Sequence, residues 1–228
     1  MPDAVMLFAA GKGTRMGALT RDRPKPLIEV AGRPLLDHAL ALADAAGVPR
    51  KVVNLHYLPG QIRAHLAPRP DVLLSEEPVL LETGGGLRAA LPLLGPGPVM
   101  TLNTDAVWTG ANPLAELRAA WNPARMDALL LLIDPSRANG HTGRGDFLLA
   151  PDGQLSRGPG PIYSGAQIVR TEGLAGIAET AFSMNLLWDR MIAEGRLFGL
   201  IHDGSWCDVG RPDGIATAEQ LLSGAGDV

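Results

Sequence analysis

Apolar and polar segments alternate along the chain in an order that predicts strands followed by helices. Apolar runs of strand length occur at residues 4–9, 51–55, 71–75 and 97–105. Segments with the periodicity of an amphipathic helix follow them, at residues 34–47, 59–67, 83–94 and 113–121. Right-handed β–α–β connections make such strands parallel. We therefore expect an α/β fold with a doubly wound, mostly parallel, Rossmann-like sheet, whose strands end at one ligand-binding edge.

The pattern changes after Met126, where the apolar runs become shorter. The tripeptide Pro151-Asp152-Gly153 separates two of these runs and is typical of a hairpin turn. These features predict a small antiparallel insertion. A helical pattern at residues 183–195, a strand at 197–204 and a closing helix at 212–222 follow. The sequence contains no internal repeat and no break in composition, so we expect residues 1–228 to form a single domain.

Composition and charge exclude several classes of partner. The 228 residues carry a formal net charge of -4 and no stripe of Lys and Arg, so no basic surface is available for nucleic acid. Cys207 is the only cysteine, which leaves no intramolecular disulfide and no thiolate metal cluster and favours a reducing compartment. The apolar N-terminal run is too short to span a bilayer and carries Asp3 where a signal peptide would be basic. We expect a cytoplasmic protein without a membrane segment.

The loop after the first predicted strand, within "FAAGKGTRMGALTRDRPKPL", combines glycines with cations. Its glycine-rich backbone can form an anion-binding nest, with Lys12, Arg15 and Lys25 nearby. A solvated basic surface loop is the alternative interpretation. Pro24 and Pro26 restrict the backbone on both sides of Lys25, which is unusual for a flexible surface lysine. The combination favours phosphate binding.

Two familiar phosphate motifs do not match this loop. The Walker A pattern requires a Lys-Ser/Thr pair that "GKGTRMGA" lacks. The dinucleotide-binding fingerprint requires a third glycine where Met16 stands, and the second predicted strand ends without the acidic residue that would bind a ribose. A nicotinamide cofactor is therefore disfavoured.

Seven short motifs, in order along the chain, identify a family. They are "AAGKGTRM", "RPKPLIEVAGRPLL", "LETGGGLRAAL", "LNTD", "GRGDF", "YSGAQIV" and "WCDVGRP". The set resembles the sugar 1-phosphate nucleotidyltransferases, and the resemblance implies the nucleotide-diphospho-sugar transferase type of fold. Within that family, "LETGGG" and "HTGRGDF" are most similar to the N-acetylmuramate 1-phosphate uridylyltransferases of peptidoglycan recycling. The implied reaction transfers UMP from UTP to N-acetylmuramate 1-phosphate and releases pyrophosphate.

The resemblance also implies roles for individual residues. The triphosphate would bind Gly11, Lys12, Gly13 and Thr14, with Arg15 on the departing pyrophosphate and Lys25 between the α-phosphate and the sugar phosphate. The base would lie against Glu77, Thr83 and Gly84, and the sugar against Gly145, Asp146, Ser164 and Gly165. The attacking phosphate oxygen is already ionised at neutral pH, so the reaction needs positioning and charge neutralisation rather than a general base.

Two polyanionic substrates favour a divalent metal, and Mg²⁺ typically takes one or two protein carboxylates. Asp105 ends an apolar strand, at the expected ligand-binding edge, although an aspartate there can also cap a turn or helix. Asp208 matches the family's second metal-binding aspartate. We therefore expect Asp105 and Asp208 to share one Mg²⁺, with Arg15, Lys25 and Asp105 as the catalytic residues.

The chain departs from the family pattern where many relatives carry a second active-site lysine. This region reads "SRGPGPIYSG", so either Arg157 substitutes or Lys25 and the metal hold the sugar phosphate alone. Two other substrate pairs stay open at this point: GTP with mannose 1-phosphate, and CTP with another phosphorylated alcohol. A catalytically silent nucleotide-sugar sensor is a further alternative, disfavoured because the cations and both aspartates are retained. A monomer and a small homo-oligomer are both compatible with the sequence.

Overall fold

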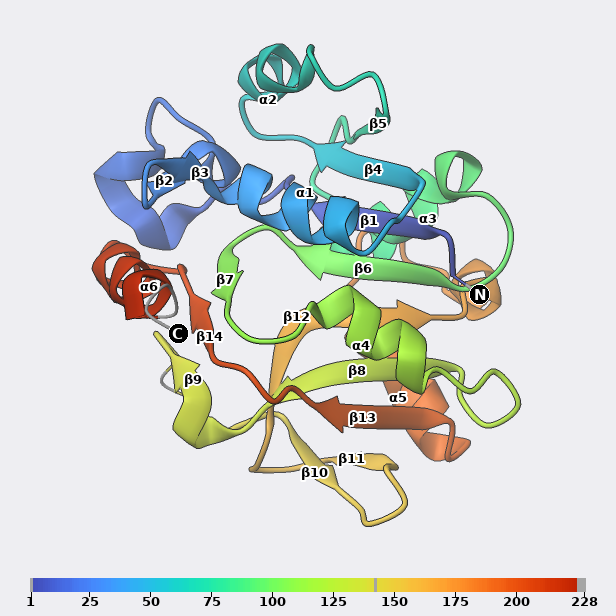
Figure 1. Cartoon of the computed structure of the whole chain (residues 1–228). Helices are drawn as coiled ribbons and strands as arrows, with labels where there is room; N and C mark the ends of the chain where they lie inside the picture. The colour runs from blue at the N-terminus through green and yellow to red at the C-terminus, as the bar shows by residue number, and fades with distance from the viewer. Residues whose placement is uncertain (1, 142, 225–228) are drawn as a thin grey trace.

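The computed structural model describes residues 2–141 and 143–224 and is built around a seven-stranded sheet. Its strands are β1 (Ala4–Phe8), β4 (Arg50–Leu55), β5 (Val72–Glu76), β6 (Val99–Asn103), β8 (Ala128–Ile133), β12 (Ile162–Val169) and β13 (Leu197–Ile201). They lie in the order β13-β8-β12-β6-β1-β4-β5. Only β12 runs antiparallel to its neighbours β6 and β8, so the carboxyl ends of the other strands share one edge, on the left in Figure 1.

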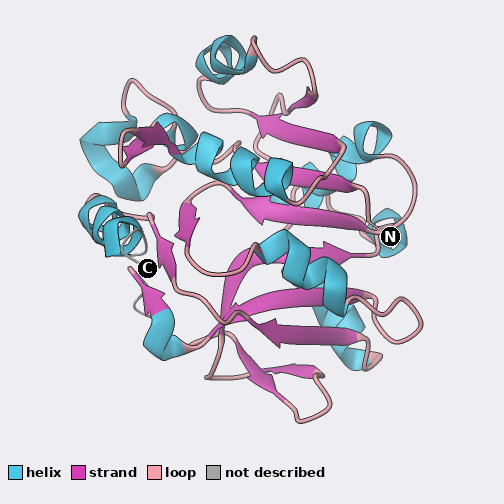
Figure 2. Ribbon diagram, viewed as in Figure 1, coloured by secondary structure: helices cyan, strands magenta, loops and turns pink. Residues whose placement is uncertain are grey.

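Helices cover both faces of this sheet (Figure 2). Helices α1 (Leu35–Ala45), α2 (Pro59–Leu66) and α4 (Pro113–Ala120) pack on one face, and α3 (Glu82–Leu94) and α5 (Asn185–Ala193) on the other. Side chains alternate between faces along a strand, so Val5 contacts the first group and Met6 the second. Within the described residues, no helix has the length and apolar character of a membrane span. The predicted doubly wound α/β fold is confirmed.

The chain after Met126 contains the predicted antiparallel segments, but its first apolar run, β8, lies in the main sheet. Strand β8 is buried at every position and belongs in the main sheet, as a continuous apolar run buried on both faces requires. The antiparallel parts are β12 and a hairpin of β10 (Phe147–Leu149) and β11 (Leu155–Arg157). The hairpin turns at Pro151-Asp152-Gly153 as predicted, with Gly153 in the left-handed region at φ 90°.

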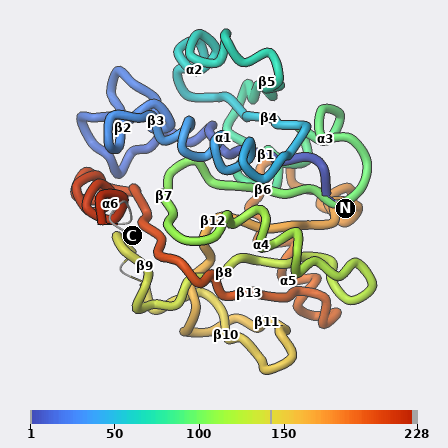
Figure 3. The backbone as a smooth tube through the Cα atoms, viewed as in Figure 1, coloured from blue at the N-terminus to red at the C-terminus, as the bar shows by residue number. Residues whose placement is uncertain are grey.

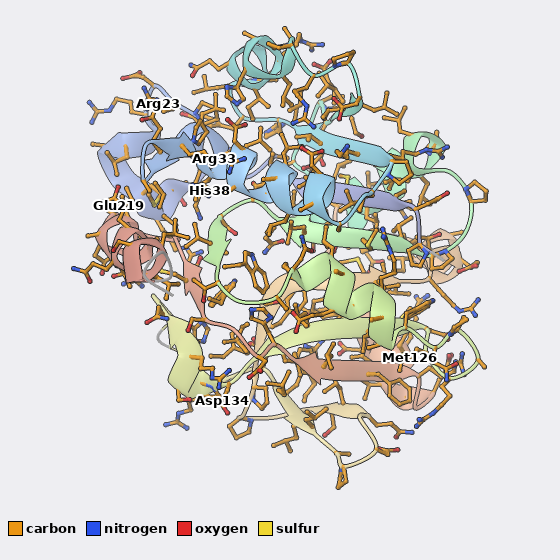
Figure 4. All side chains as sticks on the ribbon, viewed as in Figure 1. Arg23, Arg33, His38, Met126, Asp134 and Glu219 are labelled. Atoms are coloured by element: carbon orange, nitrogen blue, oxygen red, sulfur yellow. The ribbon has the colours of Figure 1, made fainter. Side chains whose placement is uncertain are left out.

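Segments from the two ends of the chain meet at the ligand-binding edge. A three-stranded sheet, β7 (Ala106–Trp108), β14 (Trp206–Asp208) and β9 (Ala138–Asn139), lies there with α6 (Asp213–Gly224) and the hairpin of β2 (Glu29–Val30) and β3 (Arg33–Pro34). Figure 3 shows the blue N-terminal and red C-terminal segments side by side. Glu219, labelled in Figure 4, accepts a hydrogen bond from the Ala31 N–H at 3.1 Å. The short 3₁₀ helices are η1 (Thr14–Thr20), η2 (Lys25–Leu27), η3 (Pro135–Arg137) and η4 (Glu172–Gly176).

Cys207 lies inside the apolar cluster between β14 and α6, and we expect its thiol to be unreactive in the folded protein. The side chain is fully buried, and burial, with a smaller contribution from the Asp208 charge, raises the pKa of the thiol to about 11. The thiolate is the reactive form, so native protein at mildly alkaline pH should not react with a disulfide reagent, while denatured protein should react stoichiometrically. Rapid labelling of the native protein would contradict this burial.

Candidate active site

The glycine-rich loop begins where β1 ends and is held by a side chain from β4. The Oδ1 atom of Asn54 accepts hydrogen bonds from the N–H groups of Ala9 and Ala10 at 2.7 and 3.3 Å. Gly13 has φ 62°, and a Cβ there would come within 2.8 Å of the Lys25 Cβ, so this position requires glycine. Gly11 lies in open space. The fold therefore shapes the backbone of the predicted phosphate loop before any ligand binds.

The cations of the N-terminal loops lie in two different environments. Lys12 and Arg15 are exposed, as a role in holding a soluble polyphosphate requires. Lys25 lies in η2, after Pro24 in extended conformation, and its side chain is only 10% exposed. Its ammonium contacts the Asp105 carboxylate at 2.7 Å. The structure thus brings together two of the predicted catalytic residues, Lys25 and Asp105.

Asp105 and Asp208 become neighbours through the pairing of β7 with β14. In this register Asp208 lies opposite Ala106, and the N–H of Val209 donates to the Asp105 carbonyl at 2.8 Å. Burial first, and then the Asp105 charge, raise the pKa of Asp208, while Lys25, Arg15 and His141 act in the opposite direction. Two carboxylates placed together in this way fit a divalent cation that fills its remaining coordination positions with phosphate and water oxygens.

Arg15 and the Asp208 carboxylate both lie close to Gly210. A Cβ on Gly210 would lie 2.7 Å from the Asp208 Oδ2 atom and 3.2 Å from the Arg15 Nη2 atom. Glycine is therefore needed where the guanidinium and the carboxylate converge. No role was predicted for this glycine from the sequence, although it stands within the "WCDVGRP" motif.

A pocket of about 360 Å³ opens beside Asp105. Its lining includes Gly11 from the phosphate loop, Asn54 from β4, and Glu77 and Thr83 from the segment that leads into α3. Glycine, polar and apolar groups thus surround one cavity that also reaches Asp105. Three of the residues predicted to bind the nucleotide, Gly11, Glu77 and Thr83, therefore line one cavity, although they come from different parts of the chain.

Within this pocket, Glu77 supports the wall rather than presenting a free carboxylate. It is 4% exposed. Its Oε1 atom accepts from the Asn54 amide at 2.6 Å, and its Oε2 atom accepts from the Leu81 N–H at 3.0 Å. The Thr83 hydroxyl oxygen accepts from the Met184 N–H at 3.0 Å and can still donate its own proton. Asn54 was missed by sequence analysis, although a polar residue near the end of a buried strand was a visible signal.

The residues predicted to bind the sugar connect the β10–β11 hairpin to β12. The Asp146 Oδ2 atom accepts from the Tyr163 N–H at 2.8 Å, and the buried Ser164 hydroxyl donates to the Leu131 carbonyl at 2.6 Å. Gly145 and Gly165 both have positive φ, at 91° and 89°. A Cβ on Gly145 would meet the Gly160 carbonyl, so the local backbone packs too closely for any other residue. Ser164 therefore shapes the strand, while Asp146 stays exposed with one oxygen engaged.

Gly165 connects this sugar segment to the nucleotide pocket. A Cβ there would lie 2.7 Å from the side chain of Asn103, which ends β6 and lines the pocket. Arg157, considered above as a substitute for the missing lysine, is bound to Asp189 at 2.8 Å and to Asn185 at 2.8 Å. The charge of Arg157 is therefore already paired with Asp189. The cation that contacts Asp105 is Lys25.

Comparison with known proteins assigns the family. Residues 5–153 match the MobA-like NTP transferase domain. A N-acetylmuramate alpha-1-phosphate uridylyltransferase of Caulobacter vibrioides is 41% identical, over 98% of both chains. An enzyme of the same name from Neisseria meningitidis is 35% identical, over 96% of this chain and 98% of its own. The chain belongs to the MobA-like NTP transferase family and is a nucleotidyltransferase, as the motifs predicted.

Solved structures agree on the fold. HddC from Yersinia pseudotuberculosis, complexed with GMP-PN, superposes with a TM-score of 0.78 at 20% identity, over 96% of this chain and 99% of that one. A putative glucose-1-phosphate thymidylyltransferase from Bacillus anthracis superposes with a TM-score of 0.77 at 15% identity, over 99% and 96%. At these identities the likeness concerns the architecture of the fold alone.

Gly84 provides a test of how α3 forms the pocket wall. Its N–H donates to the Phe182 carbonyl at 2.8 Å, and a Cβ would lie 2.4 Å from the Phe182 ring. We expect Gly84→Ala to lower the free energy of unfolding by about 1–3 kcal/mol, because the ring and backbone must move apart. Denaturant unfolding measures this.

The matched control is Gly60→Ala in α2, where a Cβ meets nothing within 4 Å. That change should be neutral or stabilise by about 0.4–1 kcal/mol, since alanine restricts the unfolded chain. Equal effects at the two glycines would show that Gly84 is not needed for close packing.

Proposed function

We propose that the protein transfers UMP from UTP to N-acetylmuramate 1-phosphate, with release of pyrophosphate, and so serves peptidoglycan recycling. The main support for this proposal is the full-length similarity to two N-acetylmuramate alpha-1-phosphate uridylyltransferases. The arrangement of Lys25, Asp105, Asp208 and Arg15 at the edge of the sheet supports the chemistry. Neither GTP with mannose 1-phosphate nor CTP with another alcohol is named for these full-length relatives.

The reaction forms one phosphorus–oxygen bond and breaks another. A phosphate oxygen of the sugar 1-phosphate attacks the α-phosphorus of UTP, and the bond to the β-phosphate breaks as pyrophosphate leaves. No proton has to be removed from the attacking oxygen. The protein accelerates the reaction by aligning two polyanions and neutralising the charge that repels them, which is the role of fixed cations in phosphoryl transfer.

Different residues bind the triphosphate, neutralise the phosphate charges and contact the sugar. The Gly11–Thr14 loop holds the triphosphate, because its backbone is preset by Asn54 and by Gly13 against Lys25. Lys25, half of the pair with Asp105, neutralises the α-phosphate and the incoming sugar phosphate. Arg15, exposed beside Asp208, stabilises the departing pyrophosphate. Gly145, Asp146 and Gly165 border the sugar.

Asp105 and Asp208 would hold Mg²⁺, and the donor set fits this ion. Both donors are carboxylates, Asp105 keeps a partly exposed side chain, and the charge of one raises the pKa of the other. Their mutual repulsion would fall if both held a divalent cation. When bound, the ion would neutralise phosphate charge and orient the phosphate oxygens.

A panel of substrates tests the function. Pyrophosphate release should be fastest with UTP and N-acetylmuramate 1-phosphate, compared with ATP, CTP and GTP, and with the 1-phosphates of N-acetylglucosamine and mannose. The whole chain is assayed with Mg²⁺ present. Faster turnover of GTP with mannose 1-phosphate would overturn the assignment, and binding without any turnover would favour the nucleotide-sugar sensor.

The metal site gives a second prediction. Asp105→Asn and Asp208→Asn should each reduce the rate on the order of 10²-fold or more, and the double variant should be little worse than either, because the two carboxylates act on one ion. Steady-state rates across the three variants measure this. Multiplicative losses, or full activity in excess chelator, would argue against a shared metal.

Two controls separate this loss from misfolding. Asp203→Asn removes an aspartate whose side chain is 94% exposed and should leave the rate unchanged. The folded-state pKa of Asp208 is raised, so its ionised form disfavours folding at pH values above the pKa of the unfolded chain. Asparagine removes that charge, and the melting temperature of Asp208→Asn should therefore not fall.

A further inference from the structure

Glu82 adopts a backbone conformation that its side chain disfavours. It is the first residue of α3 and has φ 61°, in the left-handed region that favours glycine. Ala31 and Leu58 share this feature among the described residues, but neither lines the pocket beside Asp105. Strained backbone conformations persist only where the surrounding structure imposes them, and they concentrate at active sites and ligand-binding sites.

The hydrogen-bonding capacity of Glu82 is unused, in contrast to its neighbours in the pocket. Both oxygens of Glu77 already accept hydrogen bonds, and the amide of Asn54 is engaged at both atoms. Glu82 is exposed, and no described residue donates to its carboxylate. The pocket therefore contains one strained carboxylate that is available to a ligand.

The position of Glu82 indicates which part of a nucleotide it meets. Gly11 and Asp105 mark the side of the pocket that takes phosphates, where a carboxylate would be repelled. Leu80, Glu82 and Thr83 come from the segment that opens α3 and form the part of the lining left for the base. A carboxylate only accepts hydrogen bonds, so its partner must be an N–H or O–H donor.

We propose that the Glu82 carboxylate accepts a hydrogen bond from the imide N3–H of uracil and thereby discriminates UTP from CTP. This rests on the proposed function, which makes UTP the substrate. Uracil presents a donor at N3, whereas cytosine presents a lone pair at the same position. A carboxylate oxygen and the cytosine N3 atom are both acceptors, so they cannot form a hydrogen bond. Binding of cytosine would therefore be weaker than binding of uracil. Guanine also carries donors on this edge, so Glu82 separates uracil from cytosine and not from guanine.

The test measures the binding of UTP and CTP by calorimetry with Mg²⁺ and without sugar phosphate. The wild-type protein should bind UTP about 10- to 100-fold more tightly than CTP. Glu82→Gln should reduce this ratio at least about tenfold, because an amide can donate to cytosine N3 as well as accept from uracil. Glu82→Gly should weaken UTP binding, leave CTP binding unchanged or stronger, and raise the melting temperature, since glycine tolerates the left-handed backbone.

The matched control is Ala31→Gly. Ala31 has φ 51°, is exposed, and lies outside the pocket, so this variant should leave the ratio of UTP to CTP affinity unchanged. A ratio of UTP to CTP affinity that stays at the wild-type value in Glu82→Gln would overturn the inference. So would equal weakening of UTP and CTP, which indicates a contact with the ribose or a purely structural role.

Failure of the inference about Glu82 can be distinguished from failure of the proposed function. If wild-type protein prefers UTP but turns over another sugar 1-phosphate, the proposed sugar is wrong while the role of Glu82 is still decided by the affinity ratio. If N-acetylmuramate 1-phosphate and UTP are the best substrates and Glu82→Gln keeps the wild-type ratio, the function stands and the inference falls. A wild-type protein that prefers CTP overturns both.

Discussion

The contact of the Lys25 ammonium with Asp105, beside Asp208, is the interaction on which the rest of the site depends. Two carboxylates at one strand edge repel each other, and burial raises the cost of charging the second. Lys25 and Arg15 offset part of that cost. The two carboxylates suit a metal ion, and the two cations suit phosphate groups. The positions of the glycines follow from this requirement, because Gly13 and Gly210 allow the cations and carboxylates to approach closely.

A second layer, of buried hydrogen-bonded side chains, holds this charged layer in place. Asn54 connects the start of the glycine-rich loop to Glu77, and Glu77 connects Asn54 to the segment that leads into α3. Both side chains are buried and hydrogen-bonded to each other, so they maintain the loop geometry. Two glutamates of one pocket thereby act differently: Glu77 supports the wall, and Glu82 stays exposed in a strained backbone. Burial and hydrogen bonding, rather than residue type, separate these roles.

Much of the fold could be predicted because strands and helices have different hydrophobic periods. The helix predicted at 59–67 corresponds to α2, and the strand predicted at 51–55 corresponds to β4. The region after Met126 was placed less well, since periodicity does not specify which strand a run pairs with. A strand such as β8 can sit in a separate insertion or in the main sheet with the same sequence pattern. Arg157 shows the same limit, because its pairing with Asp189 depends on how the hairpin meets α5.

The sequence alone determined the local features: the α/β alternation, the glycine-rich loop after the first strand, the proline-restricted Lys25 and the turn at Gly153. Each depends on residues that are neighbours along the chain, where steric preferences and hydrophobic period act directly. Only the tertiary structure decided that Asp105 meets Asp208 and Lys25, that Asn54 meets Glu77, and that Ser164 faces the core. These contacts depend on strand order and register, and a shift of one residue in register would turn each side chain to the opposite face of its sheet.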